Sequence, residues 1–205
     1  DVERSRGLGD VYKRQLHSLE VFFLRIYMTI FKFVVQYILP FNPPKLFDGP
    51  DSSVELARHV VSEGHKKIFI VTDAMLVKLG LLKDIEAALT EAGADYVVFD
   101  GVQPDPTIAL IEEGYALLKS NNCDAIIAVG GGSSIDAAKV MGARAKNNKS
   151  VQKMGGLFRV FFGMLPLYAV PTTAGTGSEV TIAAVVSDPD LQRKFAIMDI
   201  KLMPT

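Results

Sequence analysis

Cysteine and histidine are scarce in this chain of 205 residues, which contains one cysteine and three histidines. Cys123 has no partner for an internal disulfide, and His17, His59 and His65 are too scattered to match metal-ligand spacing. We therefore expect no disulfide framework and no metal bound by these residues. A reduced, cytoplasmic compartment fits this cysteine usage best.

An excess of basic residues is also absent, because Lys and Arg number 22 against 23 Asp and Glu, for a net charge of -1. No basic run is long enough to bind a nucleic-acid backbone, so nucleic acid is not an expected partner. Hydrophobic residues make up 49% and charged residues 22%. This is a globular composition, which excludes collagen-like and wholly disordered proteins.

The two ends of the chain carry little pattern. Residues 1–15 lack both helical and alternating periodicity and do not have the sections of a secretion signal, so we expect an irregular tail. At the other end the chain stops at Thr205, shortly after an apolar run and without a closing helix. This ending indicates a fragment of a longer protein.

An apolar stretch from Leu16 to Leu39 raises the question of a membrane span. Its polar residues fall on one stripe of a helix: Ser18, Arg25, Thr29, Lys32 and Gln36. Placing Arg25 and Lys32 in the membrane core would cost up to roughly 3 kcal/mol each, so a span is not expected. We expect residues 16–43 to form a packed or oligomer-interface helix and a Pro-rich linker, with binding to a membrane surface left open.

From residue 44 onward, strand patterns alternate with helix patterns. Uninterrupted apolar runs typical of strands buried on both faces occur at 68–71, 96–99 and 125–129. Two helix starts are marked by capping signals, a Ser52 to Glu55 capping box and an Asp105-Pro106 pair. The order predicts an α/β domain over 44–205, with a parallel sheet, flanking helices and ligands at the carboxyl ends of the strands.

The run at 125–129 leads directly into three glycines, Gly130 to Gly132, and then into a helical pattern. Glycines let a phosphate approach the backbone, and the free N–H groups and dipole of the helix start stabilise its charge. The alternative is a tight turn in which Ser133 and Asp136 form a capping box. GxGxxG, GxxxxGK[ST] and GxSxG are all absent, so no serine is predicted to be a hydrolase nucleophile.

A second loop follows the strand pattern at 167–170 and reads Pro-Thr-Thr-Ala-Gly-Thr-Gly-Ser-Glu over 171–179. Its hydroxyls and glycines offer donors and close backbone approach to a polar ligand. Together the two loops predict a site for an extended, phosphate-bearing cofactor. The alternative is a polar connection whose Thr and Ser side chains bond their own backbone.

Two further residues are candidates from their positions. Asp73, after the run at 68–71, is able to accept hydrogen bonds from ribose hydroxyls and to repel a 2′-phosphate, which would select NAD over NADP. Its alternative role is the N-cap of the helix that follows. Lys194 lies in an apolar run and either reaches the cofactor or is an exposed strand lysine, and the residues alone favour the second.

These motifs resemble the iron-containing (type III) alcohol dehydrogenase family. The resemblance rests on Gly130-Gly131-Gly132-Ser133-Ser134-Ile135-Asp136-Ala137-Ala138-Lys139 and Pro171-Thr172-Thr173-Ala174-Gly175-Thr176-Gly177-Ser178-Glu179-Val180-Thr181. Segments 71–73 and 100–107 are also similar to the family, so the resemblance runs from about Pro44 to the end. It implies a Rossmann-like domain followed by an all-helical metal domain, of which this chain is expected to contain the first.

The resemblance also implies roles for individual residues. The pyrophosphate is expected at Gly131, Gly132 and Ser133, the ribose at Asp73, the cofactor cleft along Thr172, Thr173 and Thr176, and the nicotinamide side near Lys194. The chain has Asp105 where the family often has Asn, and Ser134 where it often has Pro. The family's metal ligands, one Asp and three His, have no matching positions here.

The implied activity is NAD-dependent hydride transfer between a small alcohol and its aldehyde or ketone, assisted by Fe²⁺ or another divalent metal. No catalytic residue is assigned within this chain, which by itself is expected to be inactive. A glycerol or polyol dehydrogenase and a dehydroquinate synthase-like enzyme are alternatives with a similar glycine loop. A non-catalytic nucleotide-binding fragment is an alternative of another class, and a homo-oligomer is left open.

Overall fold

The computed structural model describes residues 19–29 and 44–205, and the chain divides into two compact units, Asp1–Asn42 and Pro43–Thr205. In the first unit, residues 19–29 are helical and expose apolar side chains such as Phe23. The expected tail, the remainder of the helix over 16–39 and the linker lie outside the described residues. No helix in the described ranges is long and apolar enough to cross a membrane.

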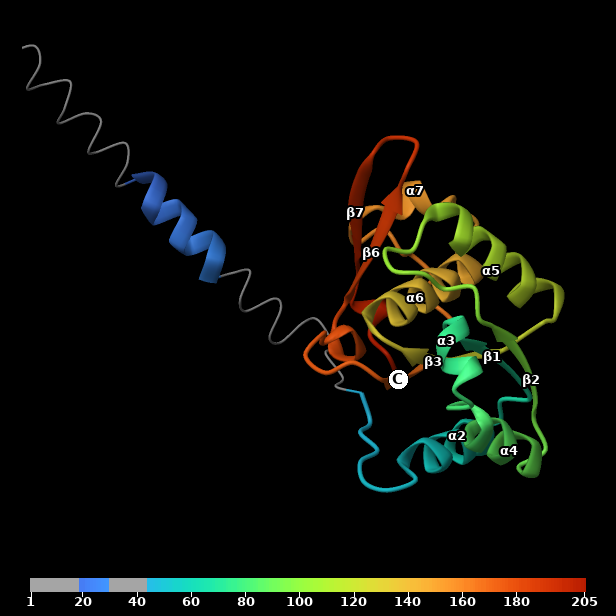
Figure 1. Ribbon diagram of the computed structural model, residues 1–205. Helices are drawn as coiled ribbons and strands as arrows, with labels where there is room; N and C mark the ends of the chain where they lie inside the picture. The colour runs from blue at the N-terminus through green and yellow to red at the C-terminus, as the bar shows by residue number, and fades with distance from the viewer. Residues whose placement is uncertain (1–18, 30–43) are drawn as a thin grey trace, which may run out of the picture. The chain divides into compact units, whose positions relative to one another are not determined.

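The second unit is built on a parallel sheet of four strands in the order β2-β1-β3-β5 (Figure 1). Its strands are β1 (Lys67–Val71), β2 (Asp95–Phe99), β3 (Ala125–Gly130) and β5 (Leu167–Pro171). Every residue of β3 is buried, which matches its uninterrupted apolar sequence. The predicted parallel sheet with flanking helices is therefore confirmed.

Helices cover both faces of this sheet because successive strand residues point to opposite sides. Ile68 and Ile70 of β1 pack with α2 (Ser52–Ser62) and α4 (Lys83–Glu91). Phe69 and Val71 pack with α5 (Ile108–Ser120) and α6 (Gly132–Lys146). The short α3 (Ala74–Lys78) follows β1 directly. Two separate apolar cores result, one on each face of the sheet.

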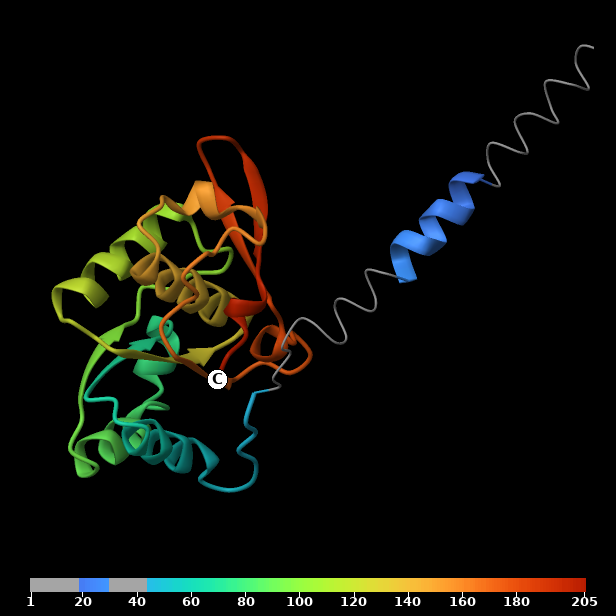
Figure 2. The same ribbon diagram turned by 180° about the vertical axis from the view of Figure 1, so that it is seen from behind.

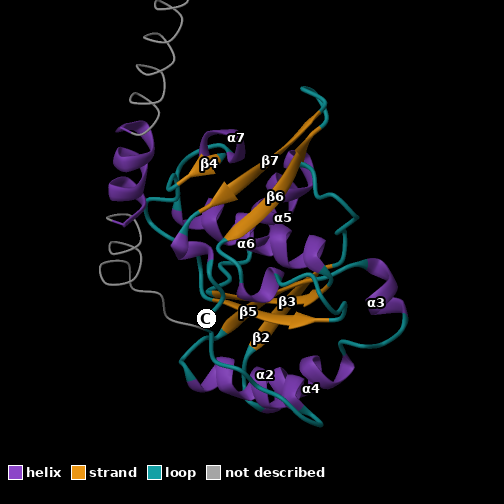
Figure 3. Ribbon diagram, turned by 90° about the vertical axis from the view of Figure 1, so that its left-hand side faces the viewer, coloured by secondary structure: helices purple, strands orange, loops and turns teal. Residues whose placement is uncertain are grey.

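A second sheet, which the sequence did not predict, lies on the outer side of α6 (Figure 3). It has the order β4-β7-β6 and consists of β4 (Gly156–Leu157), β6 (Ala183–Asp188) and β7 (Arg193–Met198). The segment before β4 forms α7 (Val151–Met154), and single 3-10 turns η1 (Ser178–Val180) and η2 (Ile200–Leu202) flank the β6-β7 hairpin. Helix α6 therefore lies between two sheets, and both of its sides are buried.

The last described residues lie beside the edge strand β5 (Figure 2). The Thr205 amide donates a hydrogen bond to the Leu167 carbonyl at 2.8 Å, and the Ile126 amide of β3 donates to the Pro166 carbonyl at 2.9 Å. These bonds hold the amino end of β5 in register with its surroundings. The carboxyl end of β5 is thereby directed toward the same edge of the sheet as the ends of β1 and β3.

The caps predicted for two helices, at Ser52 and at Asp105-Pro106, were both wrong. The N-cap of α2 is Asp51, in a left-handed conformation with φ of 62°, and it makes no side-chain cap hydrogen bond, so Ser52 and Glu55 do not form a capping box. The N-cap of α5 is Thr107, whose hydroxyl accepts a hydrogen bond from the Leu110 amide at 3.3 Å. Pro106 lies outside the helix, and its carbonyl accepts a hydrogen bond from the Ser187 amide of β6 at 2.9 Å.

Candidate functional site

The glycine loop, Gly130 to Gly132, connects the carboxyl end of β3 to the start of α6. Gly130 has a φ of 152°, and a Cβ at this position would collide with the side chain of Ser134, so the turn requires glycine. Gly131 is the N-cap of α6 and provides no capping side chain. The first N–H groups of the helix thus face the end of the sheet without a side-chain acceptor, which is favourable for binding an anion.

The alternative capping box between Ser133 and Asp136 does not form. Asp136 Oδ2 instead accepts a hydrogen bond from the Val185 amide in β6 at 3.0 Å. The carboxylate that a capping box would need is therefore hydrogen-bonded to the second sheet instead. Ser133 itself lies half-buried in the first turn of α6, beside Gly132.

The hydroxyl loop, residues 172–178, lies against the glycine loop. The Thr172 amide donates to the Gly130 carbonyl at 3.0 Å. A Cβ added to Gly131 would lie 3.1 Å from Thr173 Oγ1, and one added to Gly132 would lie 3.0 Å from Ser178 Oγ and 3.5 Å from the Cβ of Thr176. The structure therefore brings the two predicted loops together, with exposed threonines facing bare backbone.

Asp73 is placed at the end of β1, the strand beside β3. Its Oδ1 accepts hydrogen bonds from the Met75 amide at 2.9 Å and the Leu76 amide at 3.0 Å, so the predicted N-cap role is confirmed. The Leu76 side chain reaches the glycine loop, since a Cβ on Gly130 would lie 3.7 Å from its Cδ1. The second carboxylate oxygen of Asp73 does not take part in this cap.

Lys194 lies in β7 and is exposed, as its residue pattern suggested. Its Nζ forms an ion pair of 2.6 Å with Oδ1 of Asp105, which occupies the turn before α5 with a φ of 59°. Both side chains are more than half exposed, at 56% and 62%. The structure therefore pairs Lys194 with Asp105 rather than with either loop.

Lys139, for which the sequence pattern predicted no role, is fully buried in α6. Its Nζ donates hydrogen bonds to the carbonyls of Ser178, Thr181 and Ala183 at 2.7, 2.6 and 3.1 Å. Burial lowers the pKa of Lys139 from 10.5 to about 8, and the charges of Asp136 and Glu179 oppose that shift. A lysine within a run of small apolar residues, Ala137 to Val140, was the signal that could have identified it.

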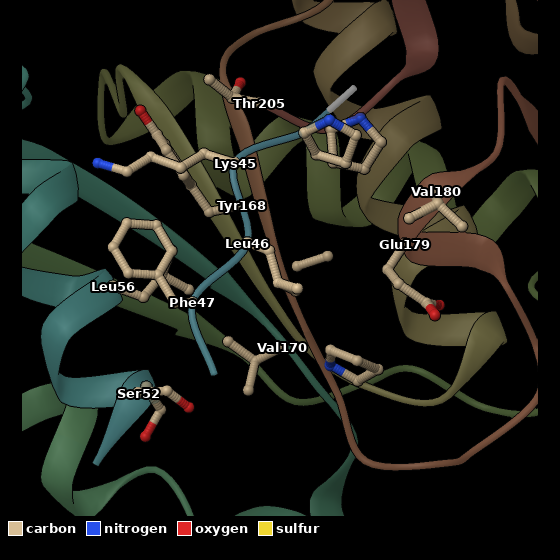
Figure 4. A pocket seen from close by; sticks show the side chains of 15 residues that line it. Lys45, Leu46, Phe47, Ser52, Leu56, Tyr168, Val170, Glu179, Val180 and Thr205 are labelled. Atoms are coloured by element: carbon tan, nitrogen blue, oxygen red, sulfur yellow. The ribbon is translucent and has the colours of Figure 1, made fainter. Parts of the chain in front are cut away.

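A cavity of about 460 Å³ lies against the edge strand β5, beside the hydroxyl loop (Figure 4). Apolar side chains including Phe47, Leu56 and Val170 line it, together with Tyr168 and Glu179. Oε2 of Glu179 is buried and makes no hydrogen bond with any described residue. The carboxylate nevertheless contributes to the charge surrounding Lys139.

Within residues 19–29 and 44–205, no three His, Cys, Asp or Glu side chains gather closely enough to hold a metal ion. Burial raises the pKa of the Cys123 thiol to about 11, so the thiol stays protonated and unreactive at neutral pH. His59 lies 3.7 Å from Glu63 on the same helix and packs against the ring of Phe47. Cys123 and His59 therefore have packing roles.

The family model described as "Iron-containing alcohol dehydrogenase" matches residues 43–205. The chain is 39% identical over 165 residues to the NAD-dependent methanol dehydrogenase of Bacillus methanolicus, covering 80% of this chain and 43% of that protein. It is 37% identical over 146 residues to lactaldehyde reductase of Escherichia coli strain K12, covering 70% and 38%.

Solved structures show the same relationship. An alcohol dehydrogenase from Oenococcus oeni superposes with a TM-score of 0.76 at 37% identity, covering 80% of this chain and 44% of that chain. A sulfoacetaldehyde reductase from Bifidobacterium kashiwanohense in complex with NAD+ superposes with a TM-score of 0.71 at 28% identity, covering 80% and 43%. The chain thus spans less than half the length of these relatives. On the strength of the match over residues 43–205, the chain belongs to the iron-containing alcohol dehydrogenase family.

Proposed function

We propose that residues 44–205 form the NAD-binding part of an enzyme that transfers hydride between a small alcohol and its aldehyde or ketone. The observation that carries this proposal is the pairing of the uncapped start of α6 with the hydroxyl loop across bare glycine backbone. A relative named as NAD-dependent and a neighbour solved with NAD+ support the choice of cofactor.

The residues of the site fit a dinucleotide. Bare backbone at Gly131 and Gly132 leaves the space that side chains would fill, and the amides of the first turn, including that of Ser133, would hold the pyrophosphate. The hydroxyls of Thr172, Thr173 and Thr176 would line the opposite wall of the cofactor cleft, where each can both donate and accept a hydrogen bond.

Asp73 would bind the adenosine ribose through the carboxylate oxygen that its helix cap does not use. The same negative charge would repel a 2′-phosphate and so favour NAD over NADP. Lys194 would assist near the nicotinamide, for which its side chain would have to leave Asp105.

In the whole enzyme, a divalent metal such as Fe²⁺ would polarise the alcohol oxygen so that hydride leaves its carbon for the nicotinamide. The metal ligands would come from sequence other than this chain, whose contribution is to bind and orient the dinucleotide. We propose a cytoplasmic enzyme acting on small alcohols or aldehydes, with the 205-residue chain inactive by itself.

Titration calorimetry with NAD and NADP tests this function. We expect saturable binding of NAD and binding of NADP that is at least about tenfold weaker, because a carboxylate facing a 2′-phosphate costs more than about 1.4 kcal/mol. Asp73→Asn keeps an oxygen for the cap but removes the charge, so this variant should bind the two cofactors with similar affinity. A folded wild-type chain that binds neither cofactor would contradict the proposal.

A further inference from the structure

Helix α6 presents two polar side chains toward the second sheet, one turn beyond the glycine loop. Lys139 lies three residues after Asp136, so the two side chains share a face of the helix. Asp136 accepts from the Val185 amide, and Lys139 contacts the carbonyls of Ser178, Thr181 and Ala183. Both side chains therefore contact the segment that runs from Ser178, at the end of the hydroxyl loop, to Val185 in β6.

The contacts of Lys139 use the full donor capacity of an ammonium group. It has three N–H donors, and three backbone carbonyls lie between 2.6 and 3.1 Å from Nζ, with Thr181 Oγ1 as a further acceptor at 3.1 Å. Burial of a charge is unfavourable unless it is paired and hydrogen-bonded. Lys139 is fully hydrogen-bonded, and the nearby charges of Asp136 and Glu179 favour its charged form.

The carbonyls that Lys139 binds belong to three successive pieces of backbone. Ser178 begins the 3-10 turn η1, Thr181 follows it in an extended conformation, and Ala183 begins β6. A single side chain thus connects a turn, a linker and a strand. Because Ser178 Oγ lies 3.0 Å from the position that a Cβ on Gly132 would take, the position of this segment also sets how closely the hydroxyl loop approaches the glycine loop.

We propose that Lys139 is a positioning residue of the cofactor site, which fixes the hydroxyl loop at the distance from the glycine loop that the pyrophosphate and nicotinamide side of NAD require. This inference rests on the proposed function and goes beyond it, because Lys139 itself is enclosed and would act through Ser178 and Thr181. The adenosine side, bounded by Asp73 and α3, would not depend on it.

The test compares Lys139→Met with Lys146→Met, an identical substitution at an exposed position of the same helix. Amide hydrogen exchange measures the order of residues 172–182, and calorimetric titrations measure the affinities for NAD and for AMP. Thr181→Val is a milder variant, which removes one hydroxyl acceptor and keeps the carbonyl. It keeps the proposal testable should Lys139→Met fail to fold.

We expect Lys139→Met to accelerate exchange in 172–182 by at least about tenfold without changing β1 and β3. The affinity for NAD should fall by at least about tenfold while that for AMP changes less than about threefold, since AMP lacks the nicotinamide half. Thr181→Val should show smaller changes in the same direction, both in exchange over 172–182 and in NAD affinity. Lys146→Met should match the wild type in both measurements.

Three outcomes would overturn the inference: unchanged exchange in 172–182, an unchanged affinity for NAD, or equal losses for NAD and AMP, which would indicate general destabilisation. Failure of the proposed function is a separate result, because the wild type itself would then bind neither NAD nor AMP. In that case accelerated exchange in Lys139→Met would establish the loop anchor but overturn its assignment to a cofactor site.

Discussion

The glycine loop and the hydroxyl loop face each other across the candidate site, yet they are held by different means. The glycine loop is continuous with β3, which is buried along its whole length, and with α6, which is enclosed by two sheets. Residues 172–176 of the hydroxyl loop are exposed, and the segment behind them is held by Lys139. One wall of the site is thus fixed by its own backbone and the other by a side chain.

This difference determines which substitutions disturb each loop. At Gly130 in the glycine loop, packing leaves no room for a side chain, so substitution acts directly on the local fold. In the hydroxyl loop, space is available and the critical residue lies behind the loop, on the neighbouring helix.

Gly130→Ala should destabilise the chain by about 4 kcal/mol, because its positive φ disfavours any side chain and the new methyl group would press on Ser134. Gly175→Ala in the hydroxyl loop is the matched control, since Gly175 also has a positive φ, of 84°, but no atom lies within 4 Å of the added Cβ. We expect Gly175→Ala to lower the free energy of unfolding by only about 1 kcal/mol. Urea unfolding measures both, and equal losses would remove the distinction between the loops.

Because of Lys139, the free energy of unfolding should increase as the pH is raised above about 8. The folded state releases the proton at about pH 8, whereas the unfolded chain keeps it up to about 10.5, so between these values the unfolded state binds more protons. The free energy of unfolding should therefore gain up to about 3 kcal/mol over that interval in the wild type relative to Lys139→Met. Below pH 8 the two curves should run parallel.

Urea unfolding at pH 7, 8, 9 and 10 measures this difference, and subtracting the variant removes the contributions of groups that titrate in both proteins. Lys146→Met serves again as the control, because an exposed lysine should leave the slope unchanged. Curves for wild type and Lys139→Met that stay parallel up to pH 10 would mean that the buried ammonium does not titrate in this range.

Asp73→Ala should cost about 1 kcal/mol, the usual loss on removing an N-cap, because the amides of Met75 and Leu76 lose their acceptor. Asp73→Asn retains an acceptor oxygen and should stay within about 0.5 kcal/mol of the wild type. Thermal unfolding of the two variants separates the cap from the charge. A large loss in Asp73→Asn would show that the charge itself stabilises the fold.

Much of the fold could be predicted because its strands are specified locally. The β-branched run over 68–71 is buried on both faces, and such runs are recognisable without knowledge of their partners. The second sheet was missed because β4 has only two residues and because β6 carries an apolar residue, Val185, at an exposed position. The burial of β6 alternates along the strand, but its sequence does not alternate between apolar and polar residues. The existence of the second sheet depends on packing against α6, which no local pattern encodes.

The candidate site shows the same division between local and long-range information. The two loops could be predicted because glycines and hydroxyls stand directly after strands. The roles of Asp136 and Lys139 could not, because their partners lie 39 to 49 residues away along the chain. A capping box was the reasonable local reading of Asp136, and a more distant amide displaced it.

The smallest expected effect concerns Lys194 and Asp105, an exposed pair that should contribute less than about 0.5 kcal/mol to stability. If Lys194 serves the cofactor, its ion pair competes with that role. Lys194→Met should then weaken NAD binding by up to about threefold, and Asp105→Asn, which releases the lysine, should strengthen it by a similar factor. Calorimetric titration measures the affinity of both variants for NAD. Changes of equal size and the same sign in the two variants would mean that Lys194 only forms a surface ion pair.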